Sequence, residues 1–161
     1  MSGTGCAVIM AGSGSDSSHI EKIVDSLNKY HIPHDVRICS AHKQPEKLVA
    51  LIREYNEVCG LVAFVAVAGG TDALSGALSF HALAPVISSP PDGDNGSCLR
   101  NPSGSSNAYI SKPANVGRFI AQMYAGVNPE IRGILERENG NKISDLEKSD
   151  IEFQKIYGGC K

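Results

Sequence analysis

Residues 61–72 read LVAFVAVAGGTD, an apolar run that ends in a turn of glycines and polar residues. A run without charged residues is typical of a parallel strand that helices cover on both faces. The strand itself is expected at residues 61–68. Further strands are expected at residues 6–11, 34–39 and 84–88, with a short last one at residues 107–110. The chain therefore predicts a parallel sheet.

Helical patterns separate the strands. Residues 17–30 and 45–57 place apolar side chains three and four positions apart, which is the spacing of an amphipathic helix. Pro45 suits the first turn of its helix, because an N–H at that position has no helical partner. Further helices are expected at residues 73–81, 113–124, 129–138 and 142–157. Strands that alternate with helices predict right-handed crossovers, and so a three-layer, doubly wound α/β fold with a helical carboxyl-terminal extension.

The chain has the size of one domain. It contains 161 residues, 42% of them hydrophobic, and we expect a single domain over residues 1–161. Residues 128–161 are expected to form a helical tail whose apolar side chains pack on a neighbouring subunit. Residues 88–106 form a polar connection that is long for a compact domain, and loops of that length often carry function.

Charge and cysteine content argue against several classes of function. The formal net charge is −2 and the basic residues are spread along the chain, so neither a nucleic-acid surface nor a membrane surface is expected. No apolar run approaches the roughly 18 residues of a membrane span, and no secretion signal is expected. Five cysteines without a C-x-x-C pair are typical of reduced thiols. We therefore expect a cytoplasmic protein with a small soluble ligand.

Three turns follow the first three strands, at the edge where open α/β sheets bind ligands. Residues 12–16, GSGSD, place glycines, hydroxyls and N–H groups at a helix start, an arrangement that favours an anion such as phosphate. The same residue types are also common in a simple helix-capping turn. The segment matches neither the G-x-x-x-x-G-K-[ST] motif nor the G-x-G-x-x-G motif.

The second turn, residues 40–43 (SAHK), offers two side chains with useful chemistry. The imidazole of His42 suits proton transfer, and Lys43 provides a positive charge for phosphate. A surface turn with an incidental histidine and lysine would have the same sequence. The third turn, residues 69–72, again places backbone amides at this edge, although paired glycines also permit close packing of a strand and a helix. Together the three turns indicate an anion-binding crevice.

The other histidines have weaker functional signals. His31 and His34 flank a proline before the second strand, at the opposite edge of the sheet, and no third ligand is near them. No metal site is therefore expected. His19 lies in the first turn of its helix, and its spacing alone assigns it no chemistry.

Four collinear segments carry a resemblance to a known family. They are Met10–Asp16, Ser40–Lys43, Ala68–Gly76 and Leu99–Gly104. In this order and spacing they resemble the phosphoribosylaminoimidazole carboxylase family of purine biosynthesis, over roughly residues 6–125. Four ordered motifs are far more specific than any one of them.

The resemblance implies that the chain carboxylates 5-aminoimidazole ribonucleotide at ring carbon C4 with CO2, reversibly and without ATP, biotin, metal or any other cofactor. His42 would carry the C4 proton. The resemblance also implies a symmetric homo-oligomer, such as a homo-octamer, with sites at subunit contacts. The substrate-binding residues it implies are Ser13, Ser15, Asp16, Ser40, Lys43, Gly69, Gly70 and Thr71, with loop contacts from Arg100 and Ser103.

Two alternative functions stay open. A second branch of the family is a mutase, which moves a carboxylate from the exocyclic nitrogen of N-carboxyaminoimidazole ribonucleotide to the ring carbon. Lys43 and His19 resemble the direct carboxylases, but Gly70 stands where that branch usually has arginine, and Thr71-Asp72 replaces its Ser-Asn. The other alternative is a flavodoxin-like nucleotide-binding module without catalysis, against which His42 beside Lys43 argues.

Overall fold

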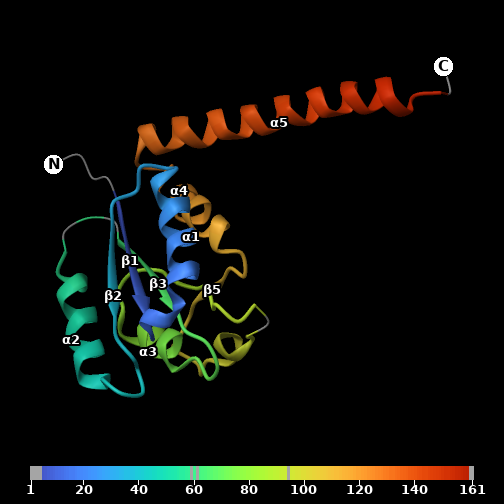
Figure 1. Cartoon of the computed structure of the whole chain (residues 1–161). Helices are drawn as coiled ribbons and strands as arrows, with labels where there is room; N and C mark the ends of the chain where they lie inside the picture. The colour runs from blue at the N-terminus through green and yellow to red at the C-terminus, as the bar shows by residue number, and fades with distance from the viewer. Residues whose placement is uncertain (1–4, 59, 61, 94, 160–161) are drawn as a thin grey trace.

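The predicted strands form one sheet in which every pairing is parallel (Figure 1). The computed structural model describes residues 5–58, 60, 62–93 and 95–159. The sheet order β2-β1-β3-β4-β5 is doubly wound and flavodoxin-like, which confirms the predicted α/β fold. Leu61, the predicted start of the third strand, lies outside the described residues. The strands are β1 (Cys6–Ala11), β2 (His34–Ile38), β3 (Val62–Val67), β4 (Val86–Ser88) and β5 (Ala108–Tyr109).

Helices cover the sheet on both faces, as predicted. On one face lie α1 (Ser17–Asn28) and α4 (Val116–Tyr124). On the other lie α2 (Pro45–Asn56) and α3 (Ala73–His81). The predicted helix at residues 113–124 begins as a short 3-10 turn before α4.

Alternate side chains of β1 enter the two helical layers, because successive strand residues point to opposite faces. Ile9 packs in the layer of α1 and α4, whereas Met10 packs in the layer of α2 and α3. Both side chains are fully buried. Burying a side chain of this size contributes about 1.5–3 kcal/mol, so the sheet is a rigid base for the turns at its edge.

α1 and α4 touch at their backbones. The Gly117 N–H donates to Ser26 Oγ at 2.9 Å, and this hydroxyl donates to the Ile23 carbonyl at 2.7 Å. A Cβ atom at position 117 would lie 2.0 Å from the Ser26 carbonyl oxygen, so the approach requires glycine. The contact fixes α1, whose first turn borders the candidate site.

One continuous helix, α5 (Pro129–Tyr157), replaces the two helices expected at residues 129–138 and 142–157. Asn128 caps it, since its side-chain oxygen accepts the N–H groups of Glu130 and Ile131. The Asn-Gly-Asn sequence at residues 139–141 weakens a helix by roughly 1 kcal/mol or less per residue. The helix continues through these residues because the penalty is small and no neighbouring element among the described residues requires a turn there.

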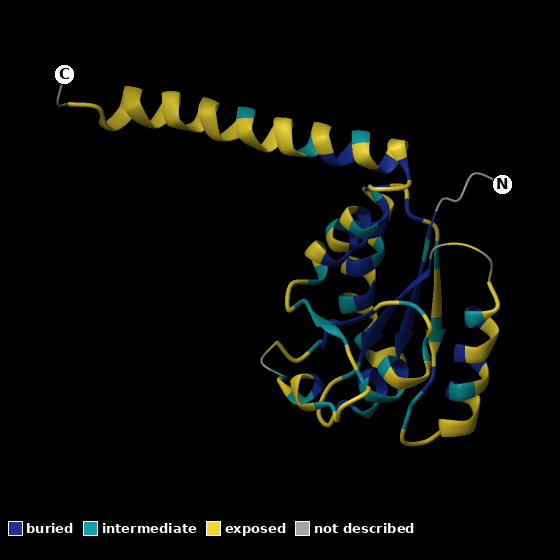
Figure 2. Cartoon of the chain, turned by 180° about the vertical axis from the view of Figure 1, so that it is seen from behind, coloured by how far each residue is buried: buried dark blue, intermediate teal, exposed yellow. Residues whose placement is uncertain are grey.

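The distal part of α5 extends away from the domain (Figures 1 and 2). Its first turns are anchored by buried Ile131, Ile134 and Leu135, but Leu146 is 71% exposed and Phe153 is 62% exposed. None of the described helices is long and apolar enough to span a membrane.

Candidate functional site

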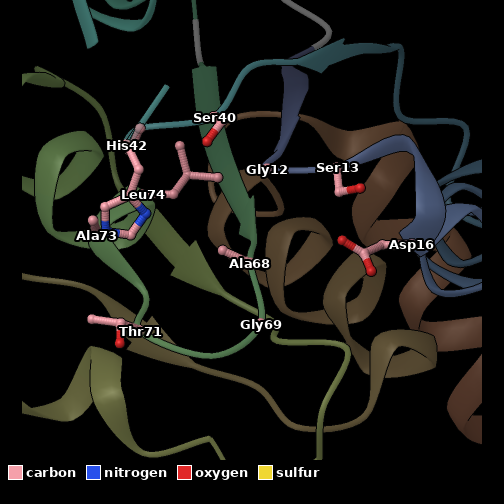
Figure 3. A pocket seen from close by; sticks show the side chains of 11 residues that line it. Gly12, Ser13, Asp16, Ser40, His42, Ala68, Gly69, Thr71, Ala73 and Leu74 are labelled. Atoms are coloured by element: carbon pink, nitrogen blue, oxygen red, sulfur yellow. The ribbon is translucent and has the colours of Figure 1, made fainter. Parts of the chain in front are cut away.

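The three predicted turns border one pocket at the carboxyl edge of the sheet (Figure 3). β1 lies there between β2 and β3, which is the point where the strand order reverses and where such sheets usually bind ligands. The pocket has a volume of about 170 Å³. Its polar lining includes Ser13 and Asp16 from the first turn, Ser40 and His42 from the second, and Gly69 and Thr71 from the third.

The first turn is stabilised by its own residues. Ser13 Oγ accepts the Ser15 N–H at 3.1 Å, and the two hydroxyl oxygens lie 2.7 Å apart. Asp16 occupies the cap position of α1 but makes no side-chain capping hydrogen bond. Its carboxylate borders the pocket and is available to a ligand, as are the N–H groups at the start of α1. The turn therefore has a capping bond of its own, from Ser15 to Ser13, and also borders the pocket.

The second turn brings His42 to the pocket wall, beside Ala73 and Leu74 (Figure 3). Backbone bonds from Cys39 N to the Ala11 carbonyl (2.9 Å) and from Gln44 N to the Ser40 carbonyl (2.8 Å) hold the two ends of this turn. The His42 side chain is exposed, and no hydrogen bond among the described residues uses its ring. Its nitrogens are therefore accessible to a bound substrate.

The third turn is held by the loop that follows β4. Gly70 has a left-handed backbone with φ of +64°. Its N–H donates to Asp92 Oδ2 at 2.8 Å, and its carbonyl accepts from Asn95 Nδ2 at 2.7 Å. The Gly70 backbone thus faces the loop, while Gly69 and Thr71 face the pocket.

Asp72 caps α3 and is almost fully buried. Its side chain accepts the Ser75 N–H at 2.8 Å, and its own N–H donates to Ser97 Oγ at 3.1 Å. Burial raises the pKa of the Asp72 carboxyl, although the hydrogen bond from Ser75 opposes that rise. The aspartate that distinguishes this turn from its apparent relatives therefore has a structural role.

Several residues expected in the site lie outside the pocket lining. They are Ser15, Lys43, Gly70, Arg100 and Ser103. Ser15 supports the first turn through Ser13, and the Lys43 N–H lies 3.4 Å from Ser40 Oγ. Arg100 ends a short 3-10 helix in the loop after β4.

Three residues of the loop after β4 were not singled out from sequence. These are Asp92, Asn95 and Ser97, which hold the third turn. The available signal was the polar composition of residues 88–106, which indicated a functional loop without identifying a partner for any of its side chains.

His19 links the first helix to the end of β4. Its Nε2 lies 3.0 Å from the Ser89 carbonyl oxygen. Because a carbonyl oxygen only accepts hydrogen bonds, Nε2 must carry a proton to form this bond. Burial lowers the pKa of His19, and it outweighs the bond to Ser89, which alone would raise the pKa. Folding therefore favours the neutral form of the His19 imidazole.

Among the described residues, no three His, Cys, Asp or Glu side chains come together as a metal centre would require. His31 instead pairs with Glu130 at 3.3 Å, and His34 Nδ1 lies 3.2 Å from the Ile32 carbonyl.

The sheet order and the crevice at its switch point define a flavodoxin-like, doubly wound protein with a polar pocket at the carboxyl edge. More particularly, the chain belongs to the AIR carboxylase family, whose family model matches residues 6–144.

Individual relatives agree with this assignment. A phosphoribosylaminoimidazole carboxylase from Archaeoglobus fulgidus is 35% identical over 154 residues, which cover 92% of this chain and 84% of the relative. The crystal structure of a Treponema denticola PurE2 variant matches with a TM-score of 0.88 at 28% identity, and the match covers 92% of this chain and 98% of that one. A protein from Methanothermobacter thermautotrophicus with the name "Probable N5-carboxyaminoimidazole ribonucleotide mutase" is 29% identical over 145 residues, which cover 90% of this chain and 43% of that protein.

Proposed function

We propose that this chain converts 5-aminoimidazole ribonucleotide and CO2 into 4-carboxy-5-aminoimidazole ribonucleotide. The observation that carries the proposal is the convergence of the three turns on one pocket, with an accessible imidazole on its wall. The names of the carboxylase relatives support the same reaction.

The chemistry needs one proton carrier. The amino group of the substrate makes its imidazole ring electron-rich, so ring carbon C4 attacks the carbon of CO2 and forms the new C–C bond. The C4 proton then leaves, which restores the aromatic ring. His42 takes this proton as the general base, and the reverse reaction uses the same group as the general acid.

The nucleotide is held by the first two turns in this proposal. Ser13 and Ser40 offer hydroxyl groups at the pocket, and the N–H groups at the start of α1 favour the negative charge of a 5′-phosphate. Lys43 lies next to this region and would attract the phosphate from outside the pocket lining. Asp16 accepts hydrogen bonds from the ribose or from the exocyclic amine.

The new carboxylate is received by the third turn. Gly69 and Thr71 line the pocket, so their backbone groups would contact the carboxylate there. The resemblance implies Gly70 as a third substrate-binding residue of this turn, but its N–H donates to Asp92, so we assign the carboxylate to Gly69 and Thr71.

A substrate test separates this reaction from that of a mutase. Purified protein would be given either 5-aminoimidazole ribonucleotide with bicarbonate and CO2, or freshly prepared N-carboxyaminoimidazole ribonucleotide under CO2-scavenging conditions. We expect turnover of the first mixture. If only the N-carboxy compound is turned over, the chain is a mutase and not a carboxylase. If neither substrate is turned over and the purified protein contains flavin, the chain is a binding module.

We also propose that the chain forms a homo-oligomer and that it is located in the cytoplasm. The exposed apolar side chains of distal α5, such as Leu146 and Phe153, support packing of this tail on a neighbouring subunit of a symmetric homo-oligomer, for which an octamer is our expectation. The free thiols of Cys6, Cys39 and Cys98 are compatible with the cytoplasm. Light scattering after gel filtration tests the assembly, and a monomer at micromolar concentration would contradict it.

A further inference from the structure

Two side chains of the loop after β4 bind both backbone polar groups of one residue in the third turn, Gly70. Asp92 Oδ2 accepts the Gly70 N–H at 2.8 Å, and Asn95 Nδ2 donates to the Gly70 carbonyl at 2.7 Å. Asn95 Nδ2 also lies 3.2 Å from Asp92 Oδ1, so the two side chains brace each other. We call Asp92 and Asn95 the loop clamp.

The loop clamp is itself held in place. Asn95 Oδ1 accepts the Ser97 N–H at 3.0 Å, and Ser97 Oγ accepts the Asp72 N–H at 3.1 Å. Asp72 caps α3, so these bonds connect the clamp to a helix that is anchored in the core. Both side-chain ends of Asn95 are used, which fixes its orientation relative to the turn.

Apart from the loop clamp, no described hydrogen bond holds Gly70. Gly70 is exposed, has no side chain and lies in the left-handed region, where glycine moves more freely than any other residue. Gly69 is also exposed, and a Cβ atom built on it would lie 3.3 Å from Asp92 Oδ2. The Asp92 carboxylate therefore covers the Gly69–Gly70 segment from the side of the loop.

We propose that Asp92 and Asn95 are positioning residues for the carboxylation step. By holding Gly70 from the loop side, they keep Gly69 and Thr71 turned toward the pocket, where CO2 is attacked and becomes a carboxylate. Neither clamp residue lines the pocket, so both act through the turn. The inference rests on the proposed function and assigns the clamp to the CO2 half of the site, separate from the nucleotide half.

The separation gives a direct test with the full-length protein. The variants are Asp92→Ala and Asn95→Ala, with Asp92→Asn as a milder change that keeps one acceptor oxygen. The measurements are the calorimetric Kd for 5-aminoimidazole ribonucleotide, kcat, and KM for CO2. We expect kcat/KM for CO2 to fall about tenfold or more in the alanine variants, since a hydrogen bond to a charged group is worth about that factor. The nucleotide Kd should stay within about twofold of wild type, because the first two turns are unchanged.

The control is Asp25→Ala, which removes an exposed carboxylate from α1, away from the clamp, and should leave all three constants unchanged. An equal loss of nucleotide affinity and turnover would overturn the inference, because it would show a general structural role. Retention of kcat/KM for CO2 in both alanine variants would also overturn it. If Asp92→Ala does not fold, Asp92→Asn and Asn95→Ala decide. A wild-type protein that binds the nucleotide but turns over neither substrate would instead refute the proposed function, and the positioning role with it.

Discussion

The first and third turns border the same pocket and have similar sequences, but they are stabilised in different ways. The first turn is held by a bond from Ser15 to Ser13, two residues apart. The third is held by a bond from Gly70 to Asp92, 22 residues away in a polar loop. One turn is therefore held by its own residues, whereas the other depends on a distant segment of the chain.

This difference separates the two halves of the proposed reaction. A self-stabilised turn presents the same groups before and after a ligand arrives, which suits tight binding of the nucleotide. A turn that depends on a loop can shift when that loop is perturbed, while the nucleotide half stays intact. Substitutions that affect binding and turnover to different extents can therefore test the comparison.

The largest effect is expected from the second turn, which carries His42. His42→Asn removes the proton carrier and should lower kcat by roughly 10²–10⁴-fold, with the nucleotide Kd unchanged, because the phosphate contacts remain. Single-turnover kinetics and calorimetry measure the two quantities separately. Wild-type turnover in this variant would remove His42 from the mechanism and leave the site without an assigned proton carrier.

The next effect compares one glycine from each turn. Gly70→Ala places a Cβ atom on a left-handed backbone and should lower the free energy of unfolding by about 1–2 kcal/mol. Gly14→Ala is the matched change in the first turn, where the backbone φ is not positive, and it should be close to neutral. In both positions a Cβ atom finds no other heavy atom within 4 Å, so a steric clash does not confuse the comparison. Urea unfolding of the two variants checks it, and equal losses would mean that the third turn is not specially strained.

A smaller effect compares the two aspartates at helix starts. Asp72 is buried and accepts the Ser75 N–H, so Asp72→Ala should lower the free energy of unfolding by about 1 kcal/mol. Asp16 makes no capping bond, so Asp16→Ala should leave stability nearly unchanged and instead raise the nucleotide Kd. Thermal unfolding and calorimetry on both variants distinguish the two roles. If Asp16→Ala lowers the stability but leaves the nucleotide Kd unchanged, Asp16 has a structural role and does not bind the nucleotide.

The sequence was sufficient for the fold because the fold depends on local patterns. Apolar runs and helical spacing located all five strands to within about two residues at each end, and they placed the turns at one edge. The boundary inside α5 was wrong because residues 139–141 favour a turn only slightly, and no local rule says whether tertiary packing requires one. Whether the helix continues through residues 139–141 depends on whether another element packs against this segment.

The candidate site, like the fold, was predictable only where its geometry depends on local sequence. Ser13, Ser40 and His42 follow strands directly, so their place at the pocket could be expected. The partner of Gly70 could not, because a pairing across 22 residues of chain depends on how the polar loop folds back. Asp72 was noted as a departure from the family pattern, and its role as a buried cap became visible only once Ser75 and Ser97 were placed beside it.

The smallest expected effect concerns the hydrogen bond between His19 and Ser89, which links α1 to the loop after β4. His19 near the first turn bonds to Ser89, the first residue of the loop that carries Asp92, and its pKa is lowered by burial. The unfolded chain therefore takes up a proton at this histidine before the folded chain does, so stability falls as the pH drops below the ordinary histidine value of about 6.5. Between pH 7.5 and 5.5 the Tm of wild type should decrease slightly more than that of His19→Gln, whose amide keeps a donor for the Ser89 carbonyl but does not titrate. Parallel Tm curves would show that folding does not favour the neutral imidazole. The link between the first turn and the loop would then rest on the hydrogen bond alone, which His19→Ala tests at pH 7.5.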